Sequence, residues 1–577
     1  METVITSQDT SPEDLPIFDC SSFPDGFIWG TALSAYQTEG AAEKRGVHTW
    51  DTFTHVYPER ITDGSNGDIA TEFYYNFQKD IEIMNKRMGM NAFRFSVAWS
   101  RIIPSGKISE GISEEGIDFY NKVIDETIHN GMVPFVTIFH WDVPQDIEDS
   151  YGGFRSHNIV SDYNDYAELC FKRFGDRVKN WITFNEPHIF IWQGYDLGVL
   201  APGRGSAWVN PACVAGDSGT EPYIVAHNLL LAHAAAVATY KKHGFDGKIG
   251  ITLDITWAKP YSASADDLQS VYRYLDFEFG WFMKPITHGD YPSIMRELVG
   301  DRLPVFNETE SNSLKGSYDF IGINYYTSTY ASANVIVDPD PTHIRYTTDM
   351  SVSLTKCDIN GQSIGFQASP SWLYVAPEGF ETALIYVKNE YGNPIIYITE
   401  NGIGDPVGLS PSDALKDIWR ISYHTLHLWK LLRAICDHKV RVKGYFAWSF
   451  IDNFEWTNGY TVRMGFYATD TKLIRTPKWS VNWFERFLKH NNAIGGTKYS
   501  FPLITSFWDI IKVDIIKATQ EAFTSGKILR QTNATSIIVV PKNADADSLI
   551  DFRPTTCCNV IYKIVTKVNF AELSPFF

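Results

Sequence analysis

The sequence predicts an α/β fold: a single (β/α)8 TIM barrel with long loops, followed by a C-terminal appendage of undetermined fold. Two observations predict it. Strand-like runs alternate with segments of helical periodicity along most of the chain, and the 577 residues exceed the roughly 400 that a barrel with long loops occupies. A hydrophobic content of 44% with 20% charged residues is typical of a globular protein with a large core.

Each strand-like run is short, apolar and rich in β-branched or aromatic residues. The eight runs lie at residues 27–35, 92–99, 134–140, 180–184, 248–256, 319–325, 394–399 and 443–450. The segments between them carry apolar residues at helical spacing, for example at 68–87, 114–130, 158–176, 226–242, 269–285, 377–391 and 413–438. Eight such units in a row predict a parallel sheet that closes into a barrel.

Two glutamates stand where strand-like runs end, in the motifs TFNEP (183–187) and ITENG (398–402). Glu186 follows the fourth run and Glu400 ends the seventh, so both are expected at the carboxyl-terminal face, where barrel enzymes place their chemistry. Cleavage of a glycosidic bond needs one carboxylic acid that holds a proton and one carboxylate that stays ionised. A lone glutamate at a strand end is more often a solvated or ion-paired loop residue, but the pair favours a glycosidase.

Other polar and aromatic side chains are predicted to surround the same face. They come from the ends of runs one, two, three, six and eight: Gln37, Arg94, His140, Asn324, Tyr326, Trp448, Glu455 and Trp456. Such a set suits a polyol, because each sugar hydroxyl both donates and accepts. Ordinary interpretations compete: Arg94 as a structural ion-pair partner, His140 as a hydrogen-bonded core histidine and Trp448 as core packing.

The charge balance argues against nucleic-acid and membrane partners. Fifty basic and 68 acidic residues give a formal net charge of −18, which repels phosphate backbones and anionic lipids. The first residues lack the features of a secretory signal, and no stretch approaches about 18 uninterrupted apolar residues. We therefore expect an intracellular protein, in the cytoplasm or the nucleus, whose partner is a small molecule. Homo-oligomerisation stays open.

The cysteines and histidines form no pattern typical of metal ligands. The seven cysteines, at 20, 170, 213, 357, 436, 557 and 558, have neither metal-ligand nor disulfide spacing. His227 and His233 lie six residues apart on a predicted helix, off one face and without acidic partners, so both are expected to be packing residues. We predict no metal site and no cofactor.

The order of several motifs resembles plant glycoside hydrolase family 1, the retaining β-glucosidases, over roughly residues 18–490, and we expect the barrel domain to span residues 18–500. Besides the two glutamate motifs, the chain has FIWGTA (27–32), SAYQTEG (34–40), FRFS (93–96), FHWD (139–142), GINYY (322–326) and WSFIDNFEW (448–456). On less specific phrases such as GGF (152–154) and KGSYDF (315–320), it is also similar to the strictosidine and raucaffricine glucosidases, which deglucosylate monoterpenoid indole alkaloids.

This resemblance implies a retaining mechanism with Glu186 as acid/base and Glu400 as nucleophile, their carboxyls about 5–5.5 Å apart. It implies that Arg94 supports Glu400 and that the other residues bind substrate: Gln37, His140, Asn185, Asn324, Tyr326, Trp372, Trp448, Glu455 and Trp456. Asn185 would hold the sugar 2-hydroxyl, Trp448 would lie beneath the ring and Trp372 would wall the aglycone. The expected products are glucose and an aglycone. The alternative is a catalytically impaired, sugar-binding pseudoenzyme.

Two departures from the family pattern concern loops near the predicted site. Plant relatives commonly carry a cysteine pair in the loop after residue 204. Here Gly205 stands at the first position and only Cys213 remains, so that disulfide is not expected. Met464 stands where phenylalanine is usual near the sugar. Methionine fills a similar volume, so altered affinity is expected rather than lost activity.

The two ends of the chain are predicted to differ from the barrel. Residues 1–17 are expected to form a flexible tail. Residues 508–577 resemble the beginning of a reverse transcriptase of the plant non-LTR retrotransposon type, in PKN (541–543), DFRP (551–554) and CCNVIYKI (557–564). The carboxylates that would bind Mg²⁺ lie further on in that family, so this fragment is expected to be non-functional and to bind no nucleic acid.

Overall fold

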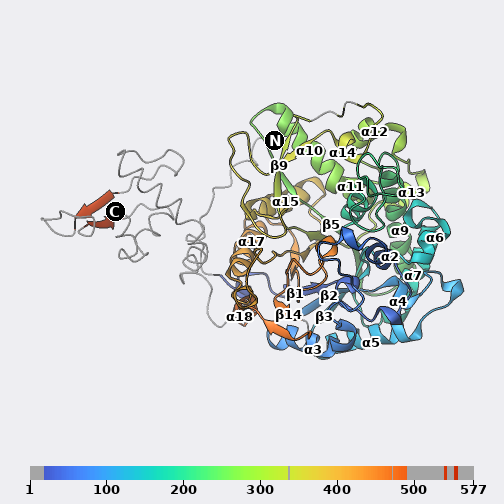
Figure 1. Ribbon diagram of the computed structural model, residues 1–577, viewed down its shortest axis with the longest axis horizontal. Coiled ribbons are helices and arrows are strands. Elements are labelled where there is room, and N and C mark those ends of the chain that lie inside the picture. The colour runs from blue at the N-terminus through green and yellow to red at the C-terminus, as the bar shows by residue number, and fades with distance from the viewer. Residues whose placement is uncertain are drawn as a thin grey trace. The chain divides into compact units, whose positions relative to one another are not determined.

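The computed structural model describes residues 18–335, 338, 340–470, 472–489, 538–541 and 552–555 (Figure 1). The chain divides into two compact units, one that contains a barrel and one that contains the last two described strands. Those two strands, β16 (Ile538–Pro541) and β17 (Phe552–Thr555), pair antiparallel. The predicted tail at 1–17 and nearly all of the predicted fragment at 508–577 lie outside the described residues.

Eight parallel strands close into a barrel, which confirms the predicted fold class. In spatial order around the barrel they are β1 (Ile28–Leu33), β13 (Val442–Ala447), β12 (Ile396–Glu400), β7 (Phe320–Asn324), β5 (Lys248–Asp254), β4 (Asn180–Asn185), β3 (Val133–Phe139) and β2 (Ala92–Ser96). Each predicted strand-like run corresponds to one of these strands. Because neighbours are parallel, all eight carboxyl ends meet at one mouth.

Helices follow the strands and surround the barrel (Figure 1). Those that correspond to predicted helical segments are α3 (Phe73–Lys86), α5 (Glu114–His129), α7 (Ile159–Phe174), α9 (Glu221–Lys242), α10 (Ala265–Leu275), α11 (Trp281–His288), α15 (Pro377–Glu390) and α17 (Ile418–Cys436). α5 shows why they form: the Ser113 hydroxyl accepts from the Gly116 N–H at its start, and its buried residues recur at helical spacing on one face.

Several predicted helices differ from the observed ones: the segment at 413–438, for example, is divided between α16 (Pro411–Ala414) and α17. The segment at 68–87 becomes helical only at Phe73, because Ala70 and Glu72 have φ angles of 50° and 51°, in the left-handed region. The segment at 269–285 is interrupted by a single π-helical turn, η8 (Asp276–Gly280), between α10 and α11. Hydrophobic periodicity does not distinguish such a turn from an ordinary helix.

The amino-terminal end of the barrel interior is filled by large side chains. Phe135 of β3 lies against Phe446 of β13 and Tyr397 of β12, with ring centroids 4.8 and 5.1 Å apart. The inner side of β1 has Gly30, where a Cβ would stand 2.4 Å from the Phe446 ring. The glycine therefore makes room for this aromatic plug, and the barrel is open only at the other end.

One helix of the described residues, α9, is long and apolar enough to cross a membrane by length and hydropathy alone. However, 72% of that apolar window is buried inside the protein. α9 packs against α7 and α13 (Glu308–Leu314) beside the barrel. It therefore has the surroundings of a core helix.

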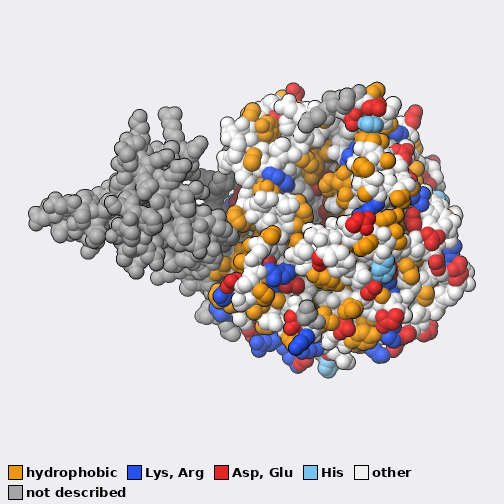
Figure 2. All heavy atoms as spheres, in the orientation of Figure 1, with side chains coloured by type: hydrophobic (Ala, Val, Ile, Leu, Met, Phe, Trp, Pro, Cys, Tyr) orange, Lys and Arg blue, Asp and Glu red, His pale blue; other side chains and the backbone are white. Residues whose placement is uncertain are grey.

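Charged side chains of both signs are mixed on the face of the barrel unit that Figure 2 shows. Acidic and basic groups alternate with hydrophobic and neutral ones there, without a continuous basic stripe on that face. A basic stripe is the usual electrostatic footprint of a nucleic-acid-binding protein. This face therefore offers no support for such a partner.

Candidate active site

A cavity of about 630 Å³ lies at the carboxyl-terminal ends of the barrel strands and contains both glutamates. Most of the predicted site residues line it: His140, Glu186, Asn324, Tyr326, Trp372, Glu400, Trp448, Glu455 and Trp456. The remaining three, Gln37, Asn185 and Arg94, are buried behind this lining. The barrel thus brings together residues that are separated by more than 300 positions in the sequence.

Glu400 ends β12 and is 4% exposed. Its Oε1 accepts a hydrogen bond from Arg94 Nη1 at 2.5 Å, and its Oε2 accepts one from the Tyr326 hydroxyl at 2.7 Å. A guanidinium and a phenol donor both stabilise the ionised carboxylate. Arg94 is therefore an ion-pair partner and a support for Glu400 at once, so the two interpretations of this residue hold together.

Glu186 follows β4 and precedes the short helix α8 (Pro187–Ile191). Its backbone is left-handed, with φ 44° and ψ 61°, a conformation that costs on the order of 1–3 kcal/mol for a residue with a Cβ. The Glu186 N–H donates to the Thr252 carbonyl at 3.0 Å, and Oε1 accepts from Asn324 Nδ2 at 2.8 Å. The turn thereby directs the carboxyl into the cavity.

The environments of the two glutamates differ in the way that acid catalysis requires. Burial, the Glu400 carboxylate and Asp254 together raise the pKa of Glu186 well above its usual value, although Asn324 and Arg94 oppose the shift. Glu186 faces one amide donor, whereas Glu400 faces a guanidinium and a hydroxyl. The proton therefore resides on Glu186 and the negative charge on Glu400.

Asn185 connects the residues behind the cavity wall. Its Oδ1 accepts from Arg94 Nη2 at 2.5 Å and from Asn324 Nδ2 at 3.1 Å, so its Nδ2 is left to donate to His140 Nε2 at 3.2 Å. Burial and Arg94 lower the pKa of His140 well below its usual value. A neutral His140 that accepts at Nε2 carries its proton on Nδ1, which can donate to a substrate hydroxyl.

Aromatic rings enclose the cavity. The rings of Trp448 and Trp456 lie nearly parallel to the His140 ring, with centroids 6.1 and 6.0 Å away. Trp372 meets Tyr326 edge to face at 5.9 Å and is 46% exposed, which places it at the rim. These flat apolar faces suit the C–H faces of a sugar and of an aromatic aglycone.

Glu455 and Met464 also line the cavity. Burial and the Glu400 carboxylate raise the pKa of Glu455 to about 8, so near neutral pH its carboxyl can donate as well as accept. Met464 is 2% exposed. Its side chain stands where the sequence analysis expected it, next to the predicted sugar site.

Gln37 supports the cavity wall from behind. Its Nε2 donates to Asn453 Oδ1 at 3.0 Å and to the Phe454 carbonyl at 2.9 Å, and its Oε1 accepts from the Ser34 hydroxyl at 2.6 Å. The amide is thus hydrogen-bonded to the segment that leads into Glu455. Its predicted contact with a sugar hydroxyl, like that of Asn185, stays a prediction.

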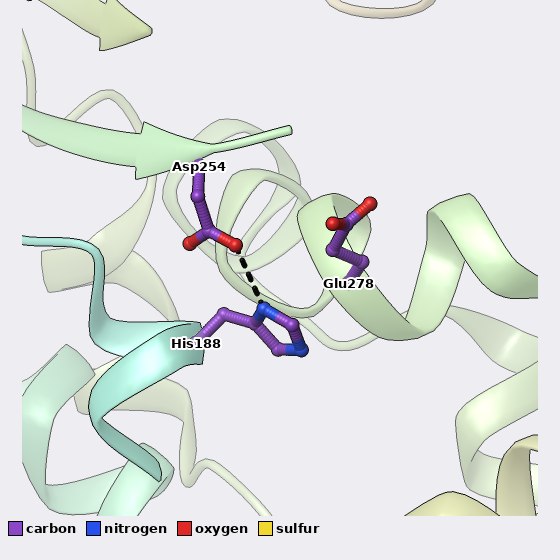
Figure 3. Close-up of side chains that lie close together, drawn as sticks. All are labelled: His188, Asp254 and Glu278. Atoms are coloured by element: carbon purple, nitrogen blue, oxygen red, sulfur yellow. Dashed lines mark hydrogen bonds and ion pairs between the residues drawn. The ribbon is translucent and has the colours of Figure 1, made fainter. Parts of the chain in front are cut away.

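The sequence analysis missed three polar side chains that line the same cavity: His188, Asp254 and Glu278 (Figure 3). His188 lies on α8, Asp254 ends β5 and Glu278 lies on the π-turn η8. Asp254 could have been noticed, because it is a carboxylate at the end of a barrel strand. No sequence pattern indicated Glu278, because its position depends on how the π-turn packs over the barrel mouth.

The fold and the site together define a glycoside hydrolase. A closed barrel holds two carboxyls in one cavity at its carboxyl-terminal mouth, one protonated and one ion-paired, among groups suited to hydroxyls. The model of glycosyl hydrolase family 1 matches residues 20–493. The chain belongs to glycosyl hydrolase family 1 and is an O-glycosyl hydrolase of the β-glucosidase type.

Similar proteins include curated plant enzymes and a solved structure. Beta-glucosidase 12 of Oryza sativa subsp. indica is 52% identical over 476 residues, which are 81% of this chain and 92% of that protein. The furostanol glycoside 26-O-beta-glucosidase of Hellenia speciosa is 50% identical over 85% of this chain and 87% of its own length. A rice Os3BGlu6 beta-glucosidase mutant, in a covalent complex with Glc from GA4GE, is 46% identical with a TM-score of 0.80, over 82% of this chain and all of that one.

Proposed function

We propose that the chain is a retaining β-glucosidase that hydrolyses the O-glucosidic bond of a small plant glucoside by double displacement. The observation that carries this proposal is the unequal environment of two carboxyls in one cavity. Glu400 is held by Arg94 and Tyr326, and Glu186 has a raised pKa. A covalent glucose complex of a similar rice enzyme supports the same route.

In the first step, a Glu400 carboxylate oxygen attacks the anomeric carbon. The bond from that carbon to the aglycone oxygen breaks, and the departing oxygen takes the proton of Glu186. The sugar is then an ester of Glu400. The raised pKa of Glu186 keeps this proton available near neutral pH.

In the second step, Glu186 is a carboxylate and acts as a base. It takes a proton from water while the water oxygen attacks the anomeric carbon and the ester bond to Glu400 breaks. Glucose leaves and both side chains return to their first states. Arg94 and Tyr326 stabilise the leaving Glu400 carboxylate, because both donate to it.

The aglycone is proposed to be a small, largely apolar plant metabolite, with a monoterpenoid indole alkaloid as one candidate. Trp372 at the rim, together with Trp192, Tyr346 and Met350 along the wall, gives the cavity the aromatic and apolar lining that such a ring system would contact. The similar motifs of alkaloid glucosidases support the same candidate.

The test is glucose release by the purified full chain from para-nitrophenyl β-D-glucoside and from strictosidine, measured side by side. Faster release from strictosidine would support the alkaloid candidate, and release from the simple glucoside alone would favour a general β-glucosidase. A folded chain that releases glucose from neither would favour the sugar-binding pseudoenzyme.

Glu400→Gly provides the matching mutational test. Removal of the nucleophile is expected to lower kcat by several orders of magnitude, because no covalent intermediate can form. The exposed Glu390→Gly, on α15, is the control and should retain wild-type turnover. Undiminished hydrolysis by Glu400→Gly would disprove the assignment of the nucleophile.

A further inference from the structure

Three titratable side chains outside the catalytic pair meet in the same cavity. One nitrogen of His188 and one carboxylate oxygen each of Asp254 and Glu278 lie within 4.8 Å of one another. Figure 3 shows the three side chains extending from a helix, a strand end and a second helix into one space. All three also line the cavity that holds Glu186 and Glu400.

The barrel order places this cluster across the mouth from the predicted sugar-binding residues. His188 and Asp254 follow from β4 and β5, whereas Trp448, Glu455 and Trp456 follow β13. In the closed barrel, β4 is separated from β13 by three strands on either side. A sugar held near β13 would therefore direct its aglycone toward the cluster.

Two carboxylate oxygens of the cluster have no hydrogen-bond partner among the described residues: Asp254 Oδ1 and Glu278 Oε2. Both residues are more than nine-tenths buried, at 7% and 2% exposed. The opposite oxygens are held, Asp254 Oδ2 by His188 Nδ1 at 2.8 Å and Glu278 Oε1 by the Thr256 N–H at 3.0 Å. Both carboxyls are thus fixed in position. The Tyr274 hydroxyl interacts with Glu278, and each carboxylate can accept a further donor from a molecule in the cavity.

The position of Glu278 depends on the π-turn η8, which interrupts the α10–α11 segment. Single π-turns of this kind are rare and occur most often at functional sites. The π-turn therefore sets the position of the Glu278 backbone, and the Glu278 carboxyl becomes part of the cavity wall.

The cluster gains an unmatched negative charge when Glu278 ionises, because a protonated His188 balances Asp254. His188 pairs with Asp254, and its second nitrogen, Nε2, lies 3.0 Å from the Tyr346 hydroxyl. Lys356 also lines the cavity, but its Nζ donates to the Ser328 carbonyl at 3.2 Å and lies over the Tyr374 ring. Among the described residues, neither carboxylate forms an ion pair with a lysine or an arginine.

We propose that Asp254 and Glu278 form an aglycone subsite that binds a protonated amine, which makes the enzyme selective for glucosides with a cationic nitrogen. This inference rests on the proposed β-glucosidase function and names its substrate class. An ammonium group supplies donors to both oxygens and stabilises the ionised form of Glu278. Tyr274, Tyr346 and Trp192, which line the same cavity, add aromatic faces near the cation.

An ammonium group fits the cluster better than a metal ion. Both ring nitrogens of His188 are already engaged, by Asp254 and by Tyr346. Burial opposes the charge on His188, but Asp254 outweighs it and raises the pKa of the imidazole. A protonated imidazole has no lone pair for a metal. The two open acceptors are carboxylate oxygens, which an N–H donor satisfies directly.

The test uses ω-aminoalkyl β-D-glucosides of increasing chain length, each compared with the ω-hydroxyalkyl glucoside of the same length. At the best length, wild-type kcat/KM is expected to be about tenfold or more higher for the amine, the size of one charge-assisted hydrogen bond. Glu278→Gln should bring this ratio close to one. The exposed Glu297→Gln is the matched control and should leave the ratio unchanged.

The pH dependence distinguishes charge recognition from shape. Burial raises the pKa of Glu278 to about 8, although His188 opposes the shift and Asp254 adds to it. Tyr274, Tyr346 and Lys356 are the other titratable groups that face it. The preference for the amine should therefore grow as pH rises toward 8, because Glu278 ionises. A pH-independent preference would contradict the proposal.

Three further outcomes would overturn the subsite without affecting the proposed function. A wild-type ratio near one at every chain length would do so, and so would a ratio that Glu278→Gln retains. Stoichiometric Zn²⁺ binding by the wild-type chain, measured by calorimetry and lost in His188→Gln, would replace the ammonium by a metal. Hydrolysis of the hydroxyalkyl glucosides reports on the proposed function separately, and it also shows that each variant is folded.

Discussion

At the scale of single residues, the site works because similar carboxyls have dissimilar neighbours. Glu400 faces a guanidinium and a phenol, and Glu186 faces an amide and two other acids. Neither side chain would have its role in the surroundings of the other. The chemistry is therefore encoded as much by Arg94, Tyr326 and Asn324 as by the glutamates.

Replacement of the proposed acid, Glu186→Gln, should remove the alkaline limb of the pH profile. In the wild type, kcat/KM is expected to fall as pH rises through the raised pKa of Glu186, because the deprotonated form cannot protonate the aglycone. Glutamine has no proton to lose. For a substrate with a poor leaving group, the variant should also be about 10²–10⁴-fold slower. An unchanged alkaline limb would contradict the assignment.

Arg94→Lys should lower kcat/KM by about 10²-fold although charge is conserved. Arg94 donates to Glu400 Oε1 through Nη1 and to Asn185 Oδ1 through Nη2, and a single ammonium cannot reproduce this planar, two-sided geometry. Steady-state kinetics on para-nitrophenyl β-D-glucoside measure the effect. The exposed Arg87→Lys is the control. Equal kinetics for both variants would show that the hydrogen bonds from Arg94 to Glu400 and Asn185 have no role in turnover.

Sequence reasoning found most of the site residues that end or follow strands. It missed Asp254, which ends β5, and residues whose position depends on packing. Glu186, Glu400 and Asn324 were predicted because a barrel puts every strand end at one mouth. Glu278 was not, because a π-turn has no hydrophobic pattern of its own. The fully engaged amide of Gln37 also could not be predicted, since its partners Asn453 and Phe454 lie more than 400 positions away.

At the scale of elements, the segment between α8 and α9 brings residue 205 close to Cys213. A Cβ at Gly205 would stand 3.5 Å from Cys213 Sγ. Both residues belong to the segment that covers one side of the mouth, after the cavity-lining residues Trp192 and Gln193. A cysteine side chain at position 205 would therefore start close to the Cys213 sulfur.

Gly205→Cys should form a disulfide with Cys213 under oxidising conditions and raise the free energy of unfolding by up to about 2–3 kcal/mol, as expected for a loop of this length. Close approach of the new Cβ to the Asp196 carbonyl, at 2.8 Å, reduces the gain. Denaturant unfolding with and without reductant measures it, and Gly205→Ser is the control. No difference between the oxidised and reduced variant, with the disulfide confirmed by mass, would contradict the expectation.

Element types were predicted well and element ends less well. All eight barrel strands and the longer helices between them were expected, because their hydrophobic patterns are long and regular, whereas short helices such as α6 (Gln145–Tyr151) were not. The start of α3 was placed too early, since left-handed residues at 70 and 72 do not interrupt the apolar pattern. Local backbone conformation, rather than periodicity, decides where an element begins.

At the scale of the whole molecule, the buried acid Asp142 contributes a pH-dependent part of the free energy of unfolding. Burial raises the pKa of Asp142 from its ordinary 3.8 to about 8, although backbone N–H groups oppose the shift. Between these values, the folded chain holds a proton that the unfolded chain has released. The contribution of Asp142 to the free energy of unfolding therefore decreases with pH in that window, by at most about 1.4 kcal/mol per pH unit.

Asp142→Asn should flatten this dependence, because an amide does not titrate. In urea unfolding between pH 5 and pH 8, the free energy of unfolding of the wild type relative to that of the variant is expected to decrease as pH rises. The exposed Asp301→Asn serves as the control and should keep the wild-type slope. Parallel curves for wild type and Asp142→Asn would show that Asp142 is ionised in the folded state.

The fold class was predictable from the sequence because a barrel repeats one simple unit. The aromatic plug at its closed end was not predicted, because Phe135, Tyr397 and Phe446 come from three distant strands and each resembles an ordinary core residue. Packing of this kind depends on the order and stagger of all the strands.

The order of strands around the barrel also fixes when the enzyme can first act during its synthesis. Glu186 leaves the ribosome early, but β12, which carries Glu400, and β13, which separates β1 from β12, are made more than 200 residues later. A nascent chain that ends before β13 therefore lacks part of the barrel mouth. The nascent chain therefore cannot cleave glucosides until its last barrel strand is inserted. The onset of hydrolysis would thus report that the barrel has finished folding.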